Sequence, residues 1–214
     1  MARPRAHDYD DKRRLILAKA AALFARYGYG GASINMIAEA CNVSKALLYH
    51  YYSDKEELLF DIIRDHLQHL VDVVAAARAE GAAPRQQLYA LSAALLDAYR
   101  NADAEHQVQI NNLQLLPPEK QKALKELERE LVRIFSHAIA KAVPDLHEDL
   151  LKPMTMSLFG MLNWHYLWFR EGRGLTRPDY ARLVTELIVS GTPAANAALM
   201  PLDSAGGGLL RGRR

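Results

Sequence analysis

The stretch SINMIAEACNVSKALLYHYYSDKEE, residues 33–57, predicts two short helices joined by a tight turn and followed by the start of a third. Ser33 is a favourable N-cap, because its hydroxyl can accept a hydrogen bond from a free backbone N–H at a helix start. Asn42 follows the first helix, and Asn is the commonest residue after Gly to accept the left-handed backbone that such a turn needs. Ser44 then caps the second helix. The pattern therefore predicts a helix-turn-helix.

The second helix, residues 45 to about 51, has one face for the core and one that looks outward. At about 100° per residue, Leu48 and Tyr52 fall together on the core side. The outward arc holds Lys45, Ala46, Tyr49 and His50. A cation, a small residue that permits close approach and two hydrogen-bonding groups suit a helix laid in the DNA major groove. The same arc is also compatible with a face that only meets solvent.

Further residues around this stretch extend the pattern. They are Phe24, Tyr27, Gly28, Ser33, Ile37, Ala38, Val43, Ser44, Leu48, Tyr49, Lys55, Glu56 and Leu58. Over about residues 10–60 they resemble the DNA-binding domain of the TetR family of one-component regulators. The resemblance implies a transcriptional repressor that binds a palindromic double-stranded DNA operator. The DNA-binding residues that it implies are Ser33, Ser44, Lys45, Ala46, Leu47, Tyr49, His50 and Lys55.

Three positions depart from the family pattern: Asn42 replaces the usual Gly, Leu47 the usual Thr, and Tyr52 the usual Phe. Asn42 can hold the same turn. Leu47 lacks a hydroxyl that in the family often binds phosphate, and its methyl groups could instead meet a thymine methyl group. The operator sequence therefore cannot be carried over from the family.

Length and composition predict an all-α protein. The chain has 214 residues, half of them apolar, with nine Pro and twelve Gly, and its commonest residues are good helix formers. We expect a helix-turn-helix DNA-binding domain at residues 1–55, a helical ligand-binding and dimerisation domain at 56–192, and a flexible tail at 193–214. The leading residues should also be flexible, with Arg3 and Arg5 either forming a minor-groove arm or remaining disordered.

Composition and motifs also limit the expected cellular location of the protein and the reactions that it could catalyse. The single cysteine, Cys41, excludes an intramolecular disulfide and is expected to be a buried structural residue. No apolar run reaches about 18 residues, and the N-terminus is polar, so we expect a cytoplasmic protein without membrane contact. The chain has no Gly-rich phosphate loop, His-Glu-X-X-His or nucleophile elbow, which argues against an enzyme. An interaction-only helical protein is a further alternative, and it would show no salt-dependent DNA binding.

The remaining chain predicts a series of amphipathic helices. A helix over residues 54–79, opened by a Ser53-X-X-Glu56 capping box, should link the two domains mechanically. His66 and His69 on it are more typical of core or surface residues than of metal ligands, and we expect no metal site. Residues 152–172 are hydrophobic nearly all round, so this helix, with residues 177–190, should form a homodimer interface of four helices.

A second resemblance concerns the effector. Asn163-Trp164, Trp168, Phe169, Arg170 and Gly172 resemble a motif of TetR-family regulators that sense acyl-coenzyme A thioesters. With the amide-rich segment HQVQINNLQLLPPE, the chain is most similar to repressors of phenylacetate degradation, which implies phenylacetyl-coenzyme A as effector and no cofactor. The expected ligand-binding residues are Tyr99, Gln109, Asn112, Leu113, Phe159, Asn163, Trp164, Trp168 and Arg170. Arg78, Arg100, Arg170 and Arg173 are candidates for the effector's phosphates. The alternative is a regulator of efflux or lipid genes that responds to a lipophilic small molecule.

Overall fold

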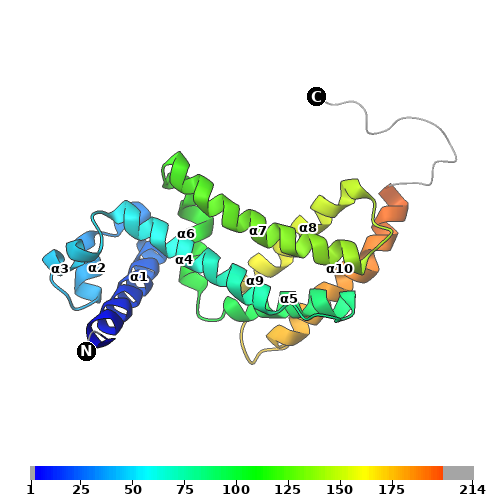
Figure 1. Cartoon of the computed structure of the whole chain (residues 1–214), viewed down its shortest axis with the longest axis horizontal. Coiled ribbons are helices and arrows are strands. Elements are labelled where there is room, and N and C mark those ends of the chain that lie inside the picture. The colour runs from blue at the N-terminus through cyan, green and yellow to red at the C-terminus, as the bar shows by residue number, and fades with distance from the viewer. Residues whose placement is uncertain (1–2, 200–214) are drawn as a thin grey trace. The chain divides into compact units, whose positions relative to one another are not determined.

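The computed structural model describes residues 3–199, with side chains from residue 8 onward, and over that range it is helical with no strand (Figure 1). This confirms the all-α prediction. The elements are α1 Arg3–Gly31, α2 Ile34–Ala40, α3 Lys45–Tyr51, α4 Lys55–Ala76, α5 Pro84–Ala98, α6 Asp103–Asn112, a 3-10 turn η1 Leu113–Leu115, α7 Pro118–Ala142, α8 Glu148–Asn163, α9 His165–Trp168 and α10 Arg177–Leu199. None of these helices is long and apolar enough to cross a lipid bilayer.

The described chain forms two compact units, and the division falls within α5 and α7. One unit contains the residues up to Ala77 together with Ala94–Leu131, and the other contains Arg78–Ala93 together with the residues from Val132 onward. The helix-turn-helix thus shares a unit with α4, α6 and the first part of α7. The predicted boundary, with a DNA-binding domain up to residue 55 and a ligand-binding domain from residue 56, stays a prediction.

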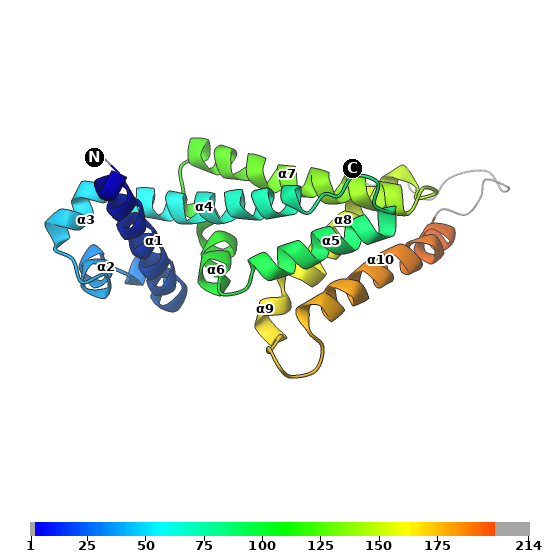
Figure 2. The same cartoon turned by 60° about the horizontal axis from the view of Figure 1, so that its bottom comes forward.

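In the first unit, α1 packs against α2, α4 and α6, and α4 also packs against α6 (Figure 2). The buried stripe of α4 includes Leu58, Ile62 and Leu70 at the three- and four-residue spacing of one helix face. Phe24 of α1 and Leu48 of α3 are each 1% exposed. These side chains form the core that holds the DNA-binding helices on α4.

The start of α1 differs from the prediction, and a kink interrupts the helix near its end. The helix already begins at Arg3, so the expected flexible leading segment is wrong from that residue onward. The side chains of Arg3 and Arg5 lie outside the described part, and their groove contact stays a prediction. Regular helical geometry ends at Gly28, whose φ of 73° and ψ of 162° interrupt the helix. Glycine adopts this positive φ without the clash that a Cβ would cause.

The N-cap of α4 is Asp54 and not Ser53, so the predicted capping box is wrong by one residue. The carboxylate of Asp54 accepts a hydrogen bond from the Glu57 backbone N–H at 2.8 Å. Glu57 in turn accepts one from the Ser53 backbone N–H at 3.1 Å. Asp54 therefore caps α4, and Glu57 binds the backbone one residue before the cap, so the pair differs from the reciprocal capping box that the sequence pattern assigned to Ser53 and Glu56.

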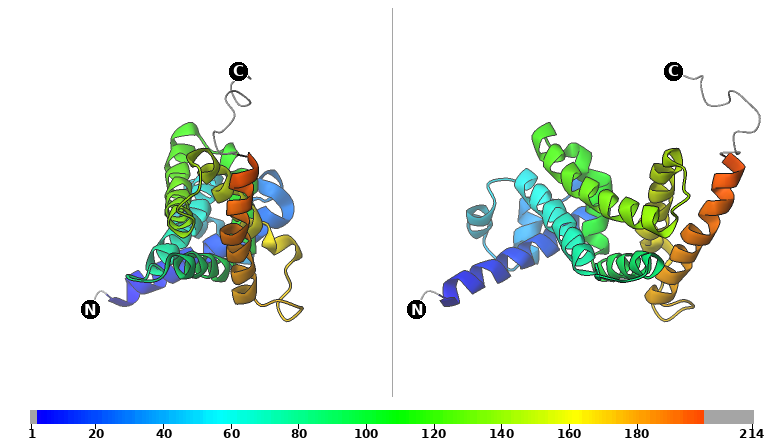
Figure 3. Two further views of the ribbon diagram at one scale, coloured as in Figure 1. Left: turned by 90° about the vertical axis from the view of Figure 1, so that its right-hand side faces the viewer. Right: turned by 45° about the vertical axis from the view of Figure 1, so that its right-hand side comes forward.

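In the second unit, α8 packs on α10 (Figure 3). The predicted continuous helix over residues 152–172 is wrong. α8 runs from Glu148 to Asn163, the chain leaves helical geometry at Trp164, α9 covers only His165–Trp168, and no helix follows until Arg177. The buried His165 lies with its Nδ1 3.1 Å from the Leu162 carbonyl oxygen, beside the break.

The helix expected over residues 177–190 continues to Leu199, so the predicted tail cannot begin at Pro193. Its extension is held by side-chain contacts. Asn196 accepts a hydrogen bond from the His147 backbone N–H at 2.9 Å and donates to the Asp145 carbonyl at 3.2 Å. These bonds join α10 to the connection between α7 and α8. The rest of the predicted tail, residues 200–214, lies outside the described residues.

Candidate functional site

The helix-turn-helix forms as the sequence predicts. Ser33 accepts a hydrogen bond from the Met36 backbone N–H at 3.2 Å and caps α2. Ser44 accepts one from the Leu47 backbone N–H at 3.1 Å and caps α3. Between the two helices Asn42 has a φ of 53°, the left-handed conformation expected of it. Each of these features is local, so the sequence alone is sufficient to predict them.

The outward face of α3 is also the predicted one. Lys45, Ala46, Leu47, Tyr49 and His50 are all exposed. The Lys45 ammonium lies 5.8 Å from the centre of the Tyr49 ring, so the cation and the aromatic ring support each other on this face. The face therefore presents one positive charge, hydrogen-bonding groups and the apolar Leu47 together, as a major-groove helix requires.

The opposite side of α3 is anchored by Leu48 and Tyr52, which are 1% and 4% exposed. The Tyr52 hydroxyl donates to the Asp61 carboxylate on α4 at 3.3 Å. Asp61 also pairs with Arg13 of α1 at 2.7 Å and with Arg64 at 2.8 Å. The hydroxyl that distinguishes Tyr52 from the family's usual Phe thus links α3 to a network of charges that joins α1 to α4.

Lys55 has a structural role in addition to the predicted DNA contact. Its ammonium donates to the carbonyl oxygens of Tyr29 at 2.7 Å and Ala32 at 3.1 Å, and it lies 4.3 Å from the centre of the Tyr29 ring. These acceptors lie just after the kink in α1, where helix carbonyls lack intrahelical donors. Its contact with DNA stays a prediction. Cys41 is 6% exposed and burial raises the pKa of its thiol, as a structural cysteine requires.

Four predicted ligand residues lie in the first unit. Tyr99 and Leu113 are buried, and Asn112 is half-buried. Gln109 donates a hydrogen bond from Nε2 to the Glu128 carboxylate at 3.0 Å, while its Oε1 is buried and accepts no hydrogen bond within the described structure. A buried amide oxygen without a donor is uncommon in folded proteins and leaves Gln109 able to accept one further hydrogen bond.

Tyr99 belongs to a buried aromatic cluster with His66 of α4 and His106 of α6. The ring centres of Tyr99 and His106 are 4.4 Å apart, and those of His66 and His106 are 5.8 Å apart. Burial lowers the pKa of His66 to about 3, and the adjacent His106 adds to this effect. Sequence reasoning did not consider His106, because a single histidine in an amide-rich helix gives no signal of its neighbours.

The predicted ligand residues of the second unit are dispersed. Phe159 is buried and packs against Phe135 with ring centres 5.0 Å apart, and Asn163 is half-buried. Trp164 and Trp168, in contrast, are 50% and 56% exposed. Arg170 donates to the backbone carbonyl of Phe169 at 2.8 Å. Within this unit, therefore, Phe159 is the one of these side chains that belongs to the core.

The four candidate phosphate-binding arginines are divided between the units: Arg100 belongs to the first, and the second contains Arg78, Arg170 and Arg173. Arg78 and Arg173 are exposed, Arg100 hydrogen-bonds Asp97 at 3.0 Å, and Arg170 contacts the backbone as described. The structure instead has a cavity of about 470 Å³ between α5 and α10 of the second unit, which sequence reasoning missed. It is lined by Arg85, Gln86, Tyr89, Arg182, Thr185 and Glu186.

α8 and α10 leave an apolar surface exposed. Leu183 and Leu187, four residues apart on one face of α10, are 42% and 53% exposed. On α8 the exposed Met156 and Gly160 are likewise four residues apart. Exposed leucine and methionine side chains on two helices that pack together are compatible with a surface that another protein covers.

Comparison with known proteins agrees with these features. Residues 16–62 match the model of the bacterial regulatory proteins of the tetR family, and residues 81–192 match the tetracyclin repressor-like C-terminal domain. The HTH-type transcriptional repressor KstR2 of Rhodococcus jostii is 26% identical over 89% of this chain and 97% of its own.

Two solved structures are also similar. A TetR-family regulator from Bordetella parapertussis is 32% identical, with a TM-score of 0.78 over 85% of this chain and 96% of its own. The regulator AibR, solved in complex with isovaleryl coenzyme A and operator DNA, is 27% identical, with a TM-score of 0.71 over 82% of this chain and 97% of its own. The C-terminal match alone spans just over half of the chain. The chain therefore belongs to the TetR family of bacterial transcriptional regulators.

Proposed function

We propose that the protein is a homodimeric repressor that binds a palindromic operator and is released from it by an acyl-coenzyme A thioester, with phenylacetyl-coenzyme A as the first candidate. The observation that carries this proposal is the ordered helix-turn-helix, with α3 capped by Ser44 and presenting Lys45, Tyr49 and His50 outward. KstR2 of Rhodococcus jostii is a repressor by name, which favours repression over activation.

Operator binding places two copies of α3 in successive major grooves, with half-sites about 34–36 Å apart. Lys45 supplies the charge, and Tyr49 and His50 supply groups that can both donate and accept hydrogen bonds to bases or phosphates. The hydroxyl of Ser44 and the backbone N–H groups of the first turn lie at the N-terminus of α3. This position is suited to a phosphate oxygen. Leu47 offers methyl groups to a thymine methyl.

The exposed apolar surface of α8 and α10 supports the homodimer. Leu183, Leu187 and Met156 lie on it, and Gly160 adds no side chain that would keep a second helix away. Burying such side chains stabilises association by about 25 cal/mol per Å² of apolar area removed from water. A two-fold symmetric four-helix arrangement would cover this surface on both copies. The proposed interface therefore consists of α8, Glu148–Asn163, and α10, Arg177–Leu199.

Two observations support an acyl-coenzyme A effector. AibR, which is similar to this chain over most of its length, was solved with isovaleryl coenzyme A. In this chain, the predicted ligand residue Gln109 keeps a buried amide oxygen open to a donor such as the amide N–H groups of the pantetheine arm. Release requires that the effector bind the DNA-incompetent arrangement more tightly. A coupling of about 1–3 kcal/mol weakens operator binding about 5–150-fold.

The test is a titration of the protein bound to its own upstream DNA with phenylacetyl-coenzyme A, followed by fluorescence anisotropy. Free coenzyme A and phenylacetate are the controls. We expect release by the thioester alone. DNA binding without release by any of the three compounds would reject this effector and favour a regulator of efflux or lipid genes that responds to a lipophilic molecule. Failure to bind any upstream DNA in a salt-dependent manner would reject the repressor itself.

A further inference from the structure

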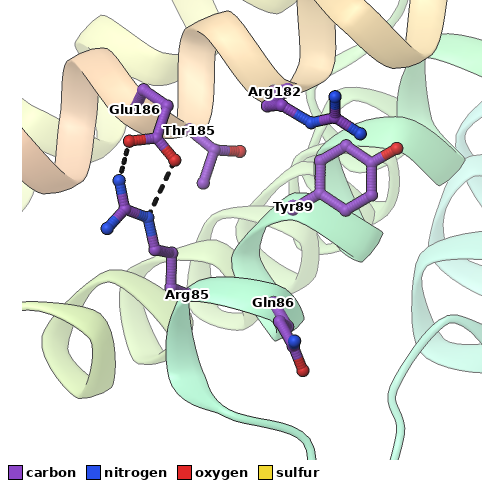
Figure 4. Close-up of a pocket in the computed structure, with 6 residues that line it drawn as sticks. All are labelled: Arg85, Gln86, Tyr89, Arg182, Thr185 and Glu186. Carbon is purple, nitrogen blue, oxygen red and sulfur yellow. Dashed lines mark hydrogen bonds and ion pairs between the residues drawn. The ribbon is translucent and has the colours of Figure 1, made fainter.

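The cavity between α5 and α10 contains two arginines in different electrostatic situations (Figure 4). Arg85 forms a forked ion pair with Glu186: its Nε donates to one carboxylate oxygen at 2.8 Å, and its terminal nitrogen contacts the other. This geometry satisfies both oxygens of Glu186. The charge of Arg85 is therefore balanced within the cavity.

Arg182 forms no comparable ion pair within the described part of the chain. It is exposed, and its guanidinium lies 5.7 Å from the centre of the Tyr89 ring (Figure 4). Its nearby acidic residue is Asp179, one turn earlier on α10, whose carboxylate accepts a hydrogen bond from the Thr176 hydroxyl at 2.6 Å. Hydrogen bonds from Thr176 are the main cause of the lowered pKa of Asp179, and the charge of Arg182 makes a smaller contribution. With two arginines and one glutamate in its lining, the cavity has one net positive charge, and that charge belongs to Arg182.

The position of Arg182 favours a phosphate as the bound group. A guanidinium presents a planar fork of donors that matches the oxygens of a phosphate. The Tyr89 ring lies beside this guanidinium as a cation–π partner. A volume of about 470 Å³ lies within the usual range of about 300–1,000 Å³ for small-molecule sites. The hydroxyl of Tyr89 and the amide of Gln86 add hydrogen-bonding groups to the lining.

We propose that this cavity binds the phosphate groups of the nucleotide end of the coenzyme A thioester, with Arg182 as the principal phosphate ligand. The inference rests on the proposed effector class and assigns a specific part of that effector to α5 and α10. It replaces the four arginines suggested by the sequence with one that only the folded chain brings to a cavity. No covalent step is involved.

The test separates the phosphates from the rest of the effector. Binding of phenylacetyl-coenzyme A and of phenylacetyl-pantetheine, which has the same thioester without the nucleotide, is measured by calorimetry for the wild type and for Arg182→Gln. We expect the substitution to weaken binding of the coenzyme A ester about tenfold, as for loss of one charge-assisted hydrogen-bonded contact, and to leave the pantetheine ester within about twofold. Arg129→Gln, an exposed arginine of α7 outside the cavity, controls for the loss of one positive charge and should bind both esters as the wild type does.

The outcomes are distinguishable. Equal weakening of both esters in Arg182→Gln would indicate a structural role and overturn the inference, as would unchanged binding of both. In either case the coenzyme A thioester would still be the effector. If the wild type binds neither ester, the proposed effector fails and the inference fails with it. Circular dichroism of each variant verifies that the helices are retained.

Discussion

His66 should make the stability of this protein fall as the pH decreases below neutrality. Its imidazole is 5% exposed, and its pKa is lowered from 6.5 to about 3, mainly by burial. A group with a depressed pKa in the folded state binds its proton more readily in the unfolded state. Its favourable contribution is therefore complete above pH 6.5 and is lost progressively as the pH falls toward 3.

The size of the effect follows from the two pKa values. At about pH 5, His66 is protonated in the unfolded state but neutral in the folded state. This difference lowers the free energy of unfolding by about 2 kcal/mol relative to pH 8, as proton linkage between the two pKa values gives. That is a substantial part of the roughly 5–15 kcal/mol that keeps a domain folded. His66→Leu removes this titration and also removes a buried Nε2 that has no hydrogen-bond partner among the described residues.

The assay is urea unfolding followed by circular dichroism at about pH 8 and about pH 5, at equal protein concentration because any self-association would shift the apparent stability. The wild type should lose about 2 kcal/mol more than His66→Leu between the two conditions. His137→Gln, an exposed histidine on α7, should behave as the wild type. If wild type and His66→Leu lose the same amount, His66 is not buried in its neutral form and the reasoning is wrong.

Four further predictions concern the helix-turn-helix, the kink in α1 and the cavity between α5 and α10. Lys45→Ala should weaken operator binding and lower the slope of log affinity against log salt concentration by about 1, measured by anisotropy, and an unchanged slope would remove Lys45 from the phosphate contacts. Tyr52→Phe should lower the free energy of unfolding by about 1 kcal/mol, because it removes the hydrogen bond to Asp61, and a neutral result in urea would show that the bond contributes nothing net. Gly28→Ala should cost about 1–3 kcal/mol through its φ of 73° and ψ of 162° alone, since a Cβ there meets no atom within 4 Å, and a stabilised variant in the same assay would contradict this. Glu186→Gln should tighten binding of the coenzyme A ester a few-fold at low salt by making the cavity more positive, and weaker binding in calorimetry would count against the phosphate assignment.

The DNA-binding half illustrates how far the sequence leads. The serine caps of α2 and α3 and the positive φ of Asn42 each depend on hydrogen bonds or sterics within a few residues, so composition and spacing suffice to predict them. The burial of Leu48 and the exposure of Tyr49 follow from helical periodicity in the same way.

The second unit shows where this reasoning fails. An apolar run over residues 152–172 suggested one helix, but the break at Trp164 occurs where buried neighbours hold His165 and Tyr180 beside it, with the Tyr180 hydroxyl donating to the Met161 carbonyl at 2.9 Å. The tail predicted from residue 193 implied a helix end there, but α10 continues to Leu199, and its Asn196 bonds to the connection before α8. In both cases contacts from distant parts of the chain override local preference.

The sequence by itself determined the helical class, the helix-turn-helix, the outward face of α3 and the family, because these depend on interactions a few residues apart. Only the tertiary structure decided which polar groups meet. Arg13 reaches Asp61 across 48 residues, and Arg85 reaches Glu186 across 101. In the same cavity Glu186 pairs with Arg85, whereas Arg182 lies beside the Tyr89 ring. The spacing of apolar residues in the sequence does not predict these ion pairs, because they arise from the packing of whole helices.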